Sequence, residues 1–173
     1  RASLTTRHTL VDGGYRFELE ARNVGDTPIP FGAGAHPYFV APSGRAEAVR
    51  LYIPGRKIVD IVDTKNVLPS GTISPIQPGS YLDFNDPAGV PLKDRALDNL
   101  WVDLEKDADG YAFAEFIDVE AKLRVRLTAL TKNIIGIQVY APGPDADPSL
   151  GKFAAIEFVT NLPDPREALW GST

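Results

Sequence analysis

The chain has 173 residues, with 18 lysines and arginines against 23 aspartates and glutamates and a formal net charge of -5. A chain of this length fits one domain that buries a single substantial core. The acidic balance argues against a nucleic-acid partner or an acidic membrane, because both would need a basic patch. No cysteine is present, which excludes disulfides and thiolate chemistry.

No apolar run approaches the roughly eighteen residues that span a bilayer, and the first twenty residues alternate in polarity where a signal peptide would have an apolar core. We therefore expect no membrane partner. The lack of disulfides is compatible with a reducing compartment and equally with secretion. Our expectation is a cytoplasmic protein, with secretion left open as the alternative.

The first expected element is a β-hairpin. Apolar and charged residues alternate from Tyr15 to Arg22, which predicts a strand with one wet face. Asp12-Gly13-Gly14 directly before it predicts a turn that pairs this strand with residues 4–11.

Further strands are expected along the rest of the chain, at residues 49–53, 58–62, 100–104, 112–119, 122–129, 135–139 and 153–159. Loops are expected between them at residues 41–46, 69–80 and 141–150. Because 15 prolines and 15 glycines are scattered along the chain, no long helical window survives, and the best candidate, residues 165–169, is one turn at most. Short strands separated by turn residues predict an all-β protein, an antiparallel sandwich or barrel.

His36 has the most specialised context of the two histidines. Residues 32–35 are all glycine or alanine, so a ligand could approach their backbone closely, and Pro37 would fix the exit of the loop. A lone histidine is also often structural, and position alone leaves both interpretations open. His8 lies among alternating polar residues and is expected to be exposed.

Two carboxylates are further candidates. Glu157 is the only charge between Phe153 and Thr160, and burying it is costly unless it is hydrogen-bonded or lines a polar cavity. It either points to water from an edge strand or faces a cleft, where desolvation would raise its pKa toward the useful range of a general base. Asp98 either satisfies donors of a turn or accepts hydrogen bonds from a ligand.

Three other motifs, a calcium loop, a dinucleotide fingerprint and a serine triad, are incomplete in this sequence. Acidic residues from Asp103 to Asp109 resemble a calcium loop, but the closing position is Phe116, so a solvated hairpin turn at residues 107–110 is expected. Gly32 and Gly34 lack the third glycine of a dinucleotide fingerprint. No serine elbow is present for a catalytic triad. We expect neither a metal nor a cofactor.

Three segments, in this order, carry a family resemblance: residues 30–39 around His36, residues 95–99 around Asp98, and residues 153–160 around Glu157. They resemble the active-site segment, the loop with the substrate-binding aspartate, and the late strand with the catalytic base of aldose 1-epimerases, the galactose mutarotase family. The resemblance implies that residues 1–173 form a single, partial galactose mutarotase-like sandwich domain. One departure is Phe158, since the family normally has proline after the glutamate.

The implied activity is interconversion of the α and β anomers of a free aldohexose without a cofactor. By the resemblance, Glu157 is the base, His36 is the acid, and Asp98 orients the sugar through its hydroxyls. Tyr38 and Trp101 are expected to border the sugar.

Two alternatives stay open. A sugar-binding or regulatory module would keep the fold without turnover. A hexose-6-phosphate mutarotase would need basic residues that converge near the pocket, and Arg45, Arg50, Arg56 and Lys57 are available for this role.

The resemblance also implies an incomplete fold. The family has an earlier histidine and an arginine in its sugar pocket that align with nothing here, and a chain with no methionine cannot begin at a translation start. We therefore expect a central and C-terminal portion of the fold, with sheet faces left exposed for self-association.

Overall fold

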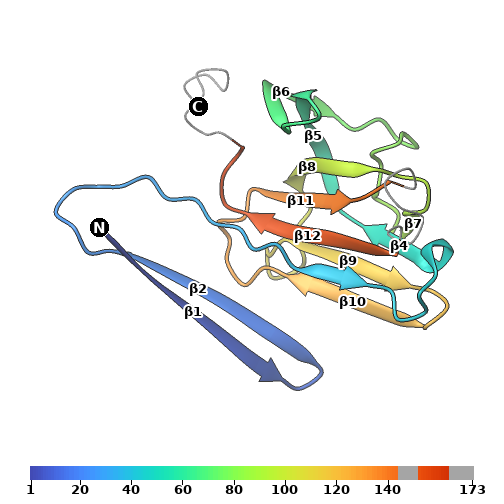
Figure 1. The fold of residues 1–173 in the computed structure, drawn as a ribbon, viewed down its shortest axis with the longest axis horizontal. Helices are drawn as coiled ribbons and strands as arrows, with labels where there is room; N and C mark the ends of the chain where they lie inside the picture. The colour runs from blue at the N-terminus through green and yellow to red at the C-terminus, as the bar shows by residue number, and fades with distance from the viewer. Residues whose placement is uncertain (144–151, 164–173) are drawn as a thin grey trace. The chain divides into compact units, whose positions relative to one another are not determined.

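The computed structural model describes residues 1–143 and 152–163. The chain divides into two compact units, Arg1–Phe31 and Gly32–Thr173. Within the described residues the regular secondary structure is all antiparallel strand, except for one short 3-10 helix, η1 (Ala46–Ala48), and there is no α-helix (Figure 1). The all-β prediction is confirmed. The single-domain prediction for residues 1–173 is not tested by this division and stays a prediction.

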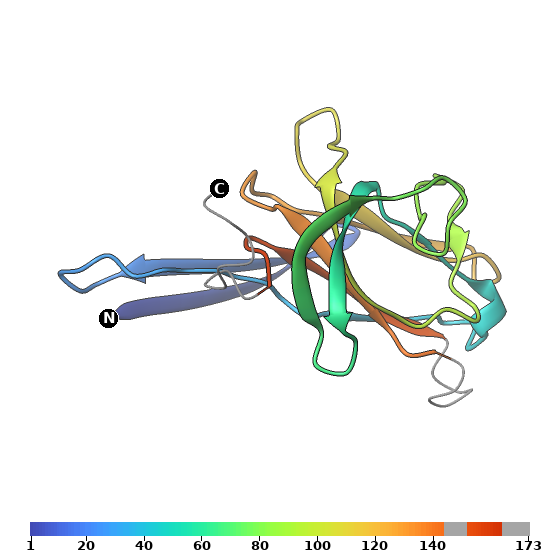
Figure 2. The same ribbon diagram turned by 90° about the horizontal axis from the view of Figure 1, so that it is seen from above.

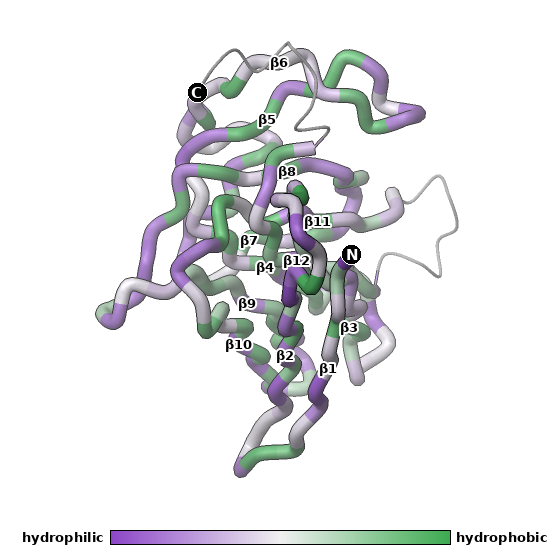
Figure 3. Tube along the Cα trace, turned by 90° about the vertical axis from the view of Figure 1, so that its left-hand side faces the viewer, coloured by the Kyte–Doolittle hydropathy of each residue, from purple (hydrophilic) through white to green (hydrophobic). Residues whose placement is uncertain are grey.

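The first unit is a hairpin of β1 (Ala2–Val11) and β2 (Gly14–Asn23), as the sequence predicts. Hydrophilic and hydrophobic residues alternate along β2 (Figure 3). The register places Leu10 opposite Tyr15 and His8 opposite Phe17, so the apolar residues of both strands share one face. His8 is exposed, as expected, and its ring contacts the Tyr15 hydroxyl.

That apolar face is exposed in the structure. Leu10 is 86% exposed, Tyr15 is 60% exposed and Phe17 is 40% exposed. The sequence pattern predicts one wet face, and the hairpin by itself has no second layer of strands to cover its apolar face. Period-two alternation identifies the face that is suited to burial, but it does not provide the layer that would bury it.

The second unit contains two antiparallel sheets. The larger has six strands in the order β3 (Tyr38–Val40), β12 (Phe153–Val159), β11 (Gly136–Ala141), β8 (Leu97–Leu104), β5 (Gly55–Asp63) and β6 (Leu68–Pro75). The smaller has four strands in the order β10 (Leu123–Thr128), β9 (Phe113–Asp118), β4 (Val49–Tyr52) and β7 (Val90–Pro91). Figure 2 shows β5 and β6 as a curved hairpin at one end of the larger sheet.

The core joins the inner faces of these two sheets. Trp101, Val139 and Ile156 from the larger sheet form one cluster with Leu51 and Phe116 from the smaller sheet, and none of the five is more than 1% exposed. Two layers of antiparallel strands around one apolar core define a β-sandwich.

Three strands were not predicted from the sequence. β6 occupies part of residues 69–80, which the sequence predicts to be a loop because Pro69, Gly71 and Pro75 interrupt any strand pattern. β6 is the edge of its sheet, where a strand tolerates proline because one side needs no partner. β3 and β7 are only 3 and 2 residues long, too short to show a period. Residues 144–150 of the last expected loop and the expected turn at 165–169 lie outside the described residues.

The acidic stretch before Gly110 forms the expected hairpin turn between β8 and β9. Asp107 accepts hydrogen bonds from the backbone N–H groups of Asp109 and Tyr111, at 3.1 and 2.8 Å. The Gly110 N–H donates to the Asp107 carbonyl at 2.9 Å. The carboxylate is therefore used to close the turn.

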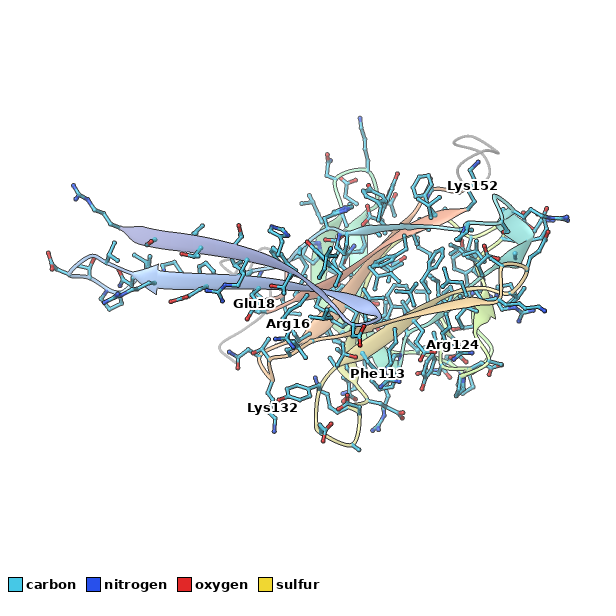
Figure 4. All side chains as sticks on the ribbon, turned by 90° about the horizontal axis from the view of Figure 1, so that it is seen from below. Arg16, Glu18, Phe113, Arg124, Lys132 and Lys152 are labelled. Carbon is cyan, nitrogen blue, oxygen red and sulfur yellow. The ribbon has the colours of Figure 1, made fainter. Side chains whose placement is uncertain are left out.

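Two carboxylates of β9 are engaged by donors around the smaller sheet. Asp118, fully buried at the end of β9, accepts hydrogen bonds from the backbone N–H groups of Ser43, Glu120 and Ala121. Burial opposes its charge, but these donors outweigh burial and hold the pKa of Asp118 below its usual range. On the outer face, Glu115 pairs with Arg124 at 2.5 Å, and Arg124 is labelled in Figure 4.

Candidate active site

The register of the larger sheet brings His36 and Glu157 together. β3 pairs with β12 so that Tyr38 lies opposite Ala155. His36 comes two residues before Tyr38 and Glu157 two residues after Ala155, so antiparallel geometry places both side chains on the same face and nearly opposite one another. His36 Nε2 lies 3.1 Å from Glu157 Oε1. The Glu157 side chain is 15% exposed and the His36 side chain is 50% exposed, so the pair opens to solvent on the histidine side.

The segment before His36 is tied to the end of β12. The Ala33 N–H donates to Thr160 Oγ1 at 2.8 Å, and the Thr160 N–H donates back to the Ala33 carbonyl at 3.0 Å. A Cβ atom at Gly32 would overlap the Asn161 side chain. Because residues 32–34 are small, this segment can pack closely against the end of β12. Gly32 and Gly34 are still exposed, so close approach of a ligand to this backbone stays a prediction.

Asp98 and Gln138 extend the polar face across two more strands. Gln138 on β11 lies directly opposite Glu157, and its Nε2 donates to Asp98 Oδ1 at 2.7 Å. Asp98 is in β8, opposite Tyr140, and not in a turn, which corrects the turn interpretation. The sequence analysis does not include Gln138 among the candidates. Gln138 is a polar residue flanked by Ile137 and Val139, and a polar residue within an apolar strand is the same signal that identifies Glu157.

The electrostatics of this face favour a proton acceptor at Glu157. Burial raises the pKa of Glu157 above its usual range. The His36 side chain opposes this rise in pKa, and the negative charge of Asp98 adds to it. A carboxylate with a raised pKa binds a proton more strongly than an exposed one, which suits a general base.

The two aromatic candidates lie on different faces of the sheet. The Tyr38 ring centroid is 4.9 Å from that of His36, and its side chain is 53% exposed. Trp101 is 0% exposed in the sandwich core, and its Nε1 donates to the Leu82 carbonyl at 3.0 Å. Because Trp101 and Asp98 are three residues apart on one strand, their side chains point to opposite faces. The expectation that Trp101 borders the sugar is therefore corrected.

The four basic residues considered for a phosphate do not form one cluster. Each is engaged with a different partner: Arg45 with Glu120 at 3.2 Å, Arg50 with the Gly89 carbonyl at 3.1 Å, Arg56 with Glu105 at 3.4 Å, and Lys57 with Asp103 at 3.7 Å. Arg50 lies on β4 of the smaller sheet, whereas Lys57 lies on β5 of the larger one. These four residues therefore do not support a shared site for a phosphorylated sugar.

Within residues 1–143 and 152–163, no group of three or more histidine, aspartate or glutamate side chains could hold a metal ion. Among the same residues, no helix is long and apolar enough to cross a membrane. What the site presents is a histidine and a carboxylate in contact, beside an amide and a second carboxylate that are hydrogen-bonded to each other. This arrangement can exchange protons and accept hydrogen bonds from hydroxyl groups.

The sequence model of the aldose 1-epimerase family matches residues 1–166. The chain therefore belongs to the aldose 1-epimerase family, as the three-segment resemblance predicts. A search of the curated proteins finds no match.

Solved structures share this fold at low sequence identity. A galactose mutarotase-like protein from Clostridium acetobutylicum superposes with a TM-score of 0.75 at 19% identity, over 93% of this chain and 46% of its own. A GalM/aldose epimerase homologue from C. elegans gives 0.69 at 19% identity, over 91% and 50%. A putative aldose 1-epimerase from Escherichia coli K12 gives 0.63 at 19% identity, over 94% and 50%. The chain spans about half the length of these proteins, and the galactose mutarotase-like fold is confirmed.

Proposed function

We propose that this site interconverts the α and β anomers of a free aldohexose by acid/base ring opening and reclosure. The observation that carries the proposal is the 3.1 Å contact between His36 Nε2 and Glu157 Oε1 on one solvent-facing side of the larger sheet. Family membership supports an epimerase role, and the chemistry of the pair supports this particular reaction.

An acid and a base in contact are suited to opening the ring of a cyclic hemiacetal. The hydroxyl oxygen that loses a proton and the ring oxygen that gains one are both bonded to C1. A catalyst therefore needs two proton-exchanging groups side by side. His36 and Glu157 meet this requirement without any conformational change that moves them toward each other.

Ring opening begins with Glu157 as carboxylate and His36 as imidazolium. Glu157 takes the proton of the C1 hydroxyl, the electron pair of that O–H bond forms the C1 carbonyl, and the C1–O5 bond breaks. The bond pair goes to O5, which takes the proton that His36 Nε2 gives up. The raised pKa of Glu157 helps the first transfer, because the carboxylate is a stronger base.

Reclosure reverses these transfers on the other face of the aldehyde. After rotation about C1–C2, O5 attacks C1 and returns its proton to His36, while the carbonyl oxygen takes its proton back from Glu157. The catalyst ends in its starting protonation state, so no cofactor or co-reactant is consumed. The configuration at C1 is inverted.

Asp98, Gln138 and Tyr38 are the proposed sugar-binding residues. Asp98 keeps an oxygen that is not bonded to Gln138 and can accept a hydroxyl hydrogen bond. Tyr38 presents a half-exposed ring beside the His36 ring, where the C–H face of a sugar could pack. A free hexose is therefore the proposed small-molecule partner.

The two histidines provide a matched test of the proposal. Polarimetry of freshly dissolved α-glucose and α-galactose should show that the chain speeds the approach to anomeric equilibrium. His36→Asn should lower the rate constant by about 10²-fold or more, whereas His8→Asn, in the exposed hairpin, should leave it unchanged. Equal rates in the wild-type chain and His36→Asn would contradict the proposal. Sugar binding without any turnover in the wild-type chain would favour the sugar-binding module.

A further inference from the structure

In the described part of the chain, the half of β8 that carries Asp98 is paired with a strand on one side only. β11 pairs with β8 from Leu97 to Val102, whereas β5 pairs with it only at Trp101 and beyond. Among these residues, the start of β8 therefore has no neighbouring strand on its second edge. An unpaired edge leaves backbone groups without ladder partners and permits fraying.

The Tyr81 hydroxyl makes the hydrogen bonds that a neighbouring strand would make to Ala96, directly before β8. Tyr81 Oη accepts a hydrogen bond from the Ala96 N–H at 2.7 Å and donates one to the Ala96 carbonyl at 3.1 Å. A phenol has one donor and spare lone pairs, so it can satisfy both backbone groups of one residue. Ala96 is two residues before Asp98, and Leu97 between them is buried in the core. A fixed Ala96 therefore leaves little freedom for Asp98.

Residues 81–84, which we call the 81–84 strut, contact the chain both before and after Asp98. Tyr81 contacts Ala96 on one side, and the Leu82 carbonyl accepts the Trp101 Nε1 hydrogen bond at 3.0 Å on the other. Phe84 is fully buried and meets the Trp101 ring edge-on, with ring centroids 5.8 Å apart.

Arg95 attaches the strut to the chain that enters β8. Its guanidinium carbon lies 5.3 Å from the Tyr81 ring centroid and 4.8 Å from that of Phe84. Arg95 also donates a hydrogen bond to the Tyr81 backbone carbonyl. A cation between two aromatic rings favours one arrangement of the strut.

We propose that Tyr81 is a positioning residue for Asp98: the 81–84 strut holds the start of β8 so that Asp98 stays in hydrogen-bond contact with Gln138 and ready for a sugar hydroxyl. Tyr81 itself contacts backbone and does not touch the proton-transferring pair. Its consequence for sugar binding rests on the proposed function, whereas its consequence for the Asp98–Gln138 contact does not.

The first measurement needs no sugar. The side-chain amide signals of Gln138 are followed by ¹H–¹⁵N NMR in the wild-type chain, Tyr81→Phe and Asp98→Ala. Asp98→Ala removes the acceptor and defines the position of a Gln138 amide without this bond. Tyr81→Phe keeps the ring under Arg95 and removes only the hydroxyl, and we expect its Gln138 signals to move toward the Asp98→Ala position. Tyr52→Phe, on the smaller sheet, is the matched control and should leave them in place.

The second measurement is hexose affinity by NMR titration. Loss of one hydrogen-bonding group predicts about fivefold weaker binding in Tyr81→Phe. In the Asp98→Ala background the same change should cause no further loss, because there is no carboxylate left to position. A general loss of stability would weaken binding in both backgrounds.

The outcomes separate the two proposals. Gln138 signals that keep their wild-type positions in a folded Tyr81→Phe chain would overturn the positioning role, as would an equal further loss of affinity in Asp98→Ala. If Tyr81→Phe does not fold, Arg95→Lys, which keeps the charge but loosens the strut, should shift the Gln138 signals in the same direction, and unchanged signals would overturn the role. A wild-type chain that binds no hexose would contradict the proposed function, while the Gln138 signals would still decide the role of Tyr81.

Discussion

Gln138 lies directly across the β11–β12 ladder from Glu157, but its side-chain amide donates its hydrogen bond to Asp98. The amide thus holds the second carboxylate in place and leaves the Glu157 oxygens to His36. The two carboxylates still interact through space, because the charge of Asp98 raises the pKa of Glu157.

Asp98→Asn should therefore lower the pKa of Glu157, because it removes the negative charge that helps to raise it. The base acts in its ionised form, so the rate of anomerisation rises as pH increases through this pKa. The acid limb of the pH–rate profile should move to lower pH in Asp98→Asn, and the KM for the hexose should rise about tenfold with the loss of a charged acceptor. Asp103→Asn, in the same strand but exposed, is the control and should shift neither. An acid limb that moves to higher pH would show that the coupling has the opposite sign.

Asp118→Asn should destabilise the fold and change its pH dependence. The native pKa of Asp118 is held below its usual range, so the charged carboxylate adds stability above the pKa of the unfolded chain, and this stability is lost as pH falls through the native pKa. Thermal unfolding should show a fall in Tm of several degrees at neutral pH and a smaller difference at acid pH. A Tm difference that is the same at every pH would argue against a contribution from its charge.

The exposed apolar face of the β1–β2 hairpin predicts self-association of the chain. Leu10, Tyr15 and Phe17 contribute to this face, and apolar surface of this kind favours contact with a second copy. Light scattering should give a mass that grows with concentration, and Phe17→Glu should reduce it. Arg16→Glu, on the other face of β2, is the matched control and should not. A monomer at every concentration would contradict this prediction.

Much of the fold could be predicted because alternation survives wherever one face of a strand is apolar. β2 and β10 show this period directly, and residues 153–159 form β12 as expected. β6 was not predicted, because edge strands accept proline and glycine, whereas a search for alternating polarity treats these residues as strand breaks.

The candidate site divides in the same way. His36 and Glu157 could be identified as unusual residues in their segments, but their contact depends on the pairing of β3 with β12, which spacing in the sequence cannot show. Trp101 was misplaced because Leu100-Trp101-Val102 is apolar throughout, so no alternation shows which side chain faces the core. Gln138 was not predicted, because burying a neutral amide in a strand costs less than burying a charge and is a weaker sign of a functional site.

The role of Glu157 as the base is tested most directly by Glu157→Gln. The amide keeps the shape of the side chain but cannot take a proton, so polarimetry should show the rate constant of hexose anomerisation lowered by about 10²-fold or more. NMR titration should still show weak hexose binding in this variant. Glu105→Gln, an exposed glutamate paired with Arg56, should retain the wild-type rate. Anomerisation by Glu157→Gln at the wild-type rate would contradict the account.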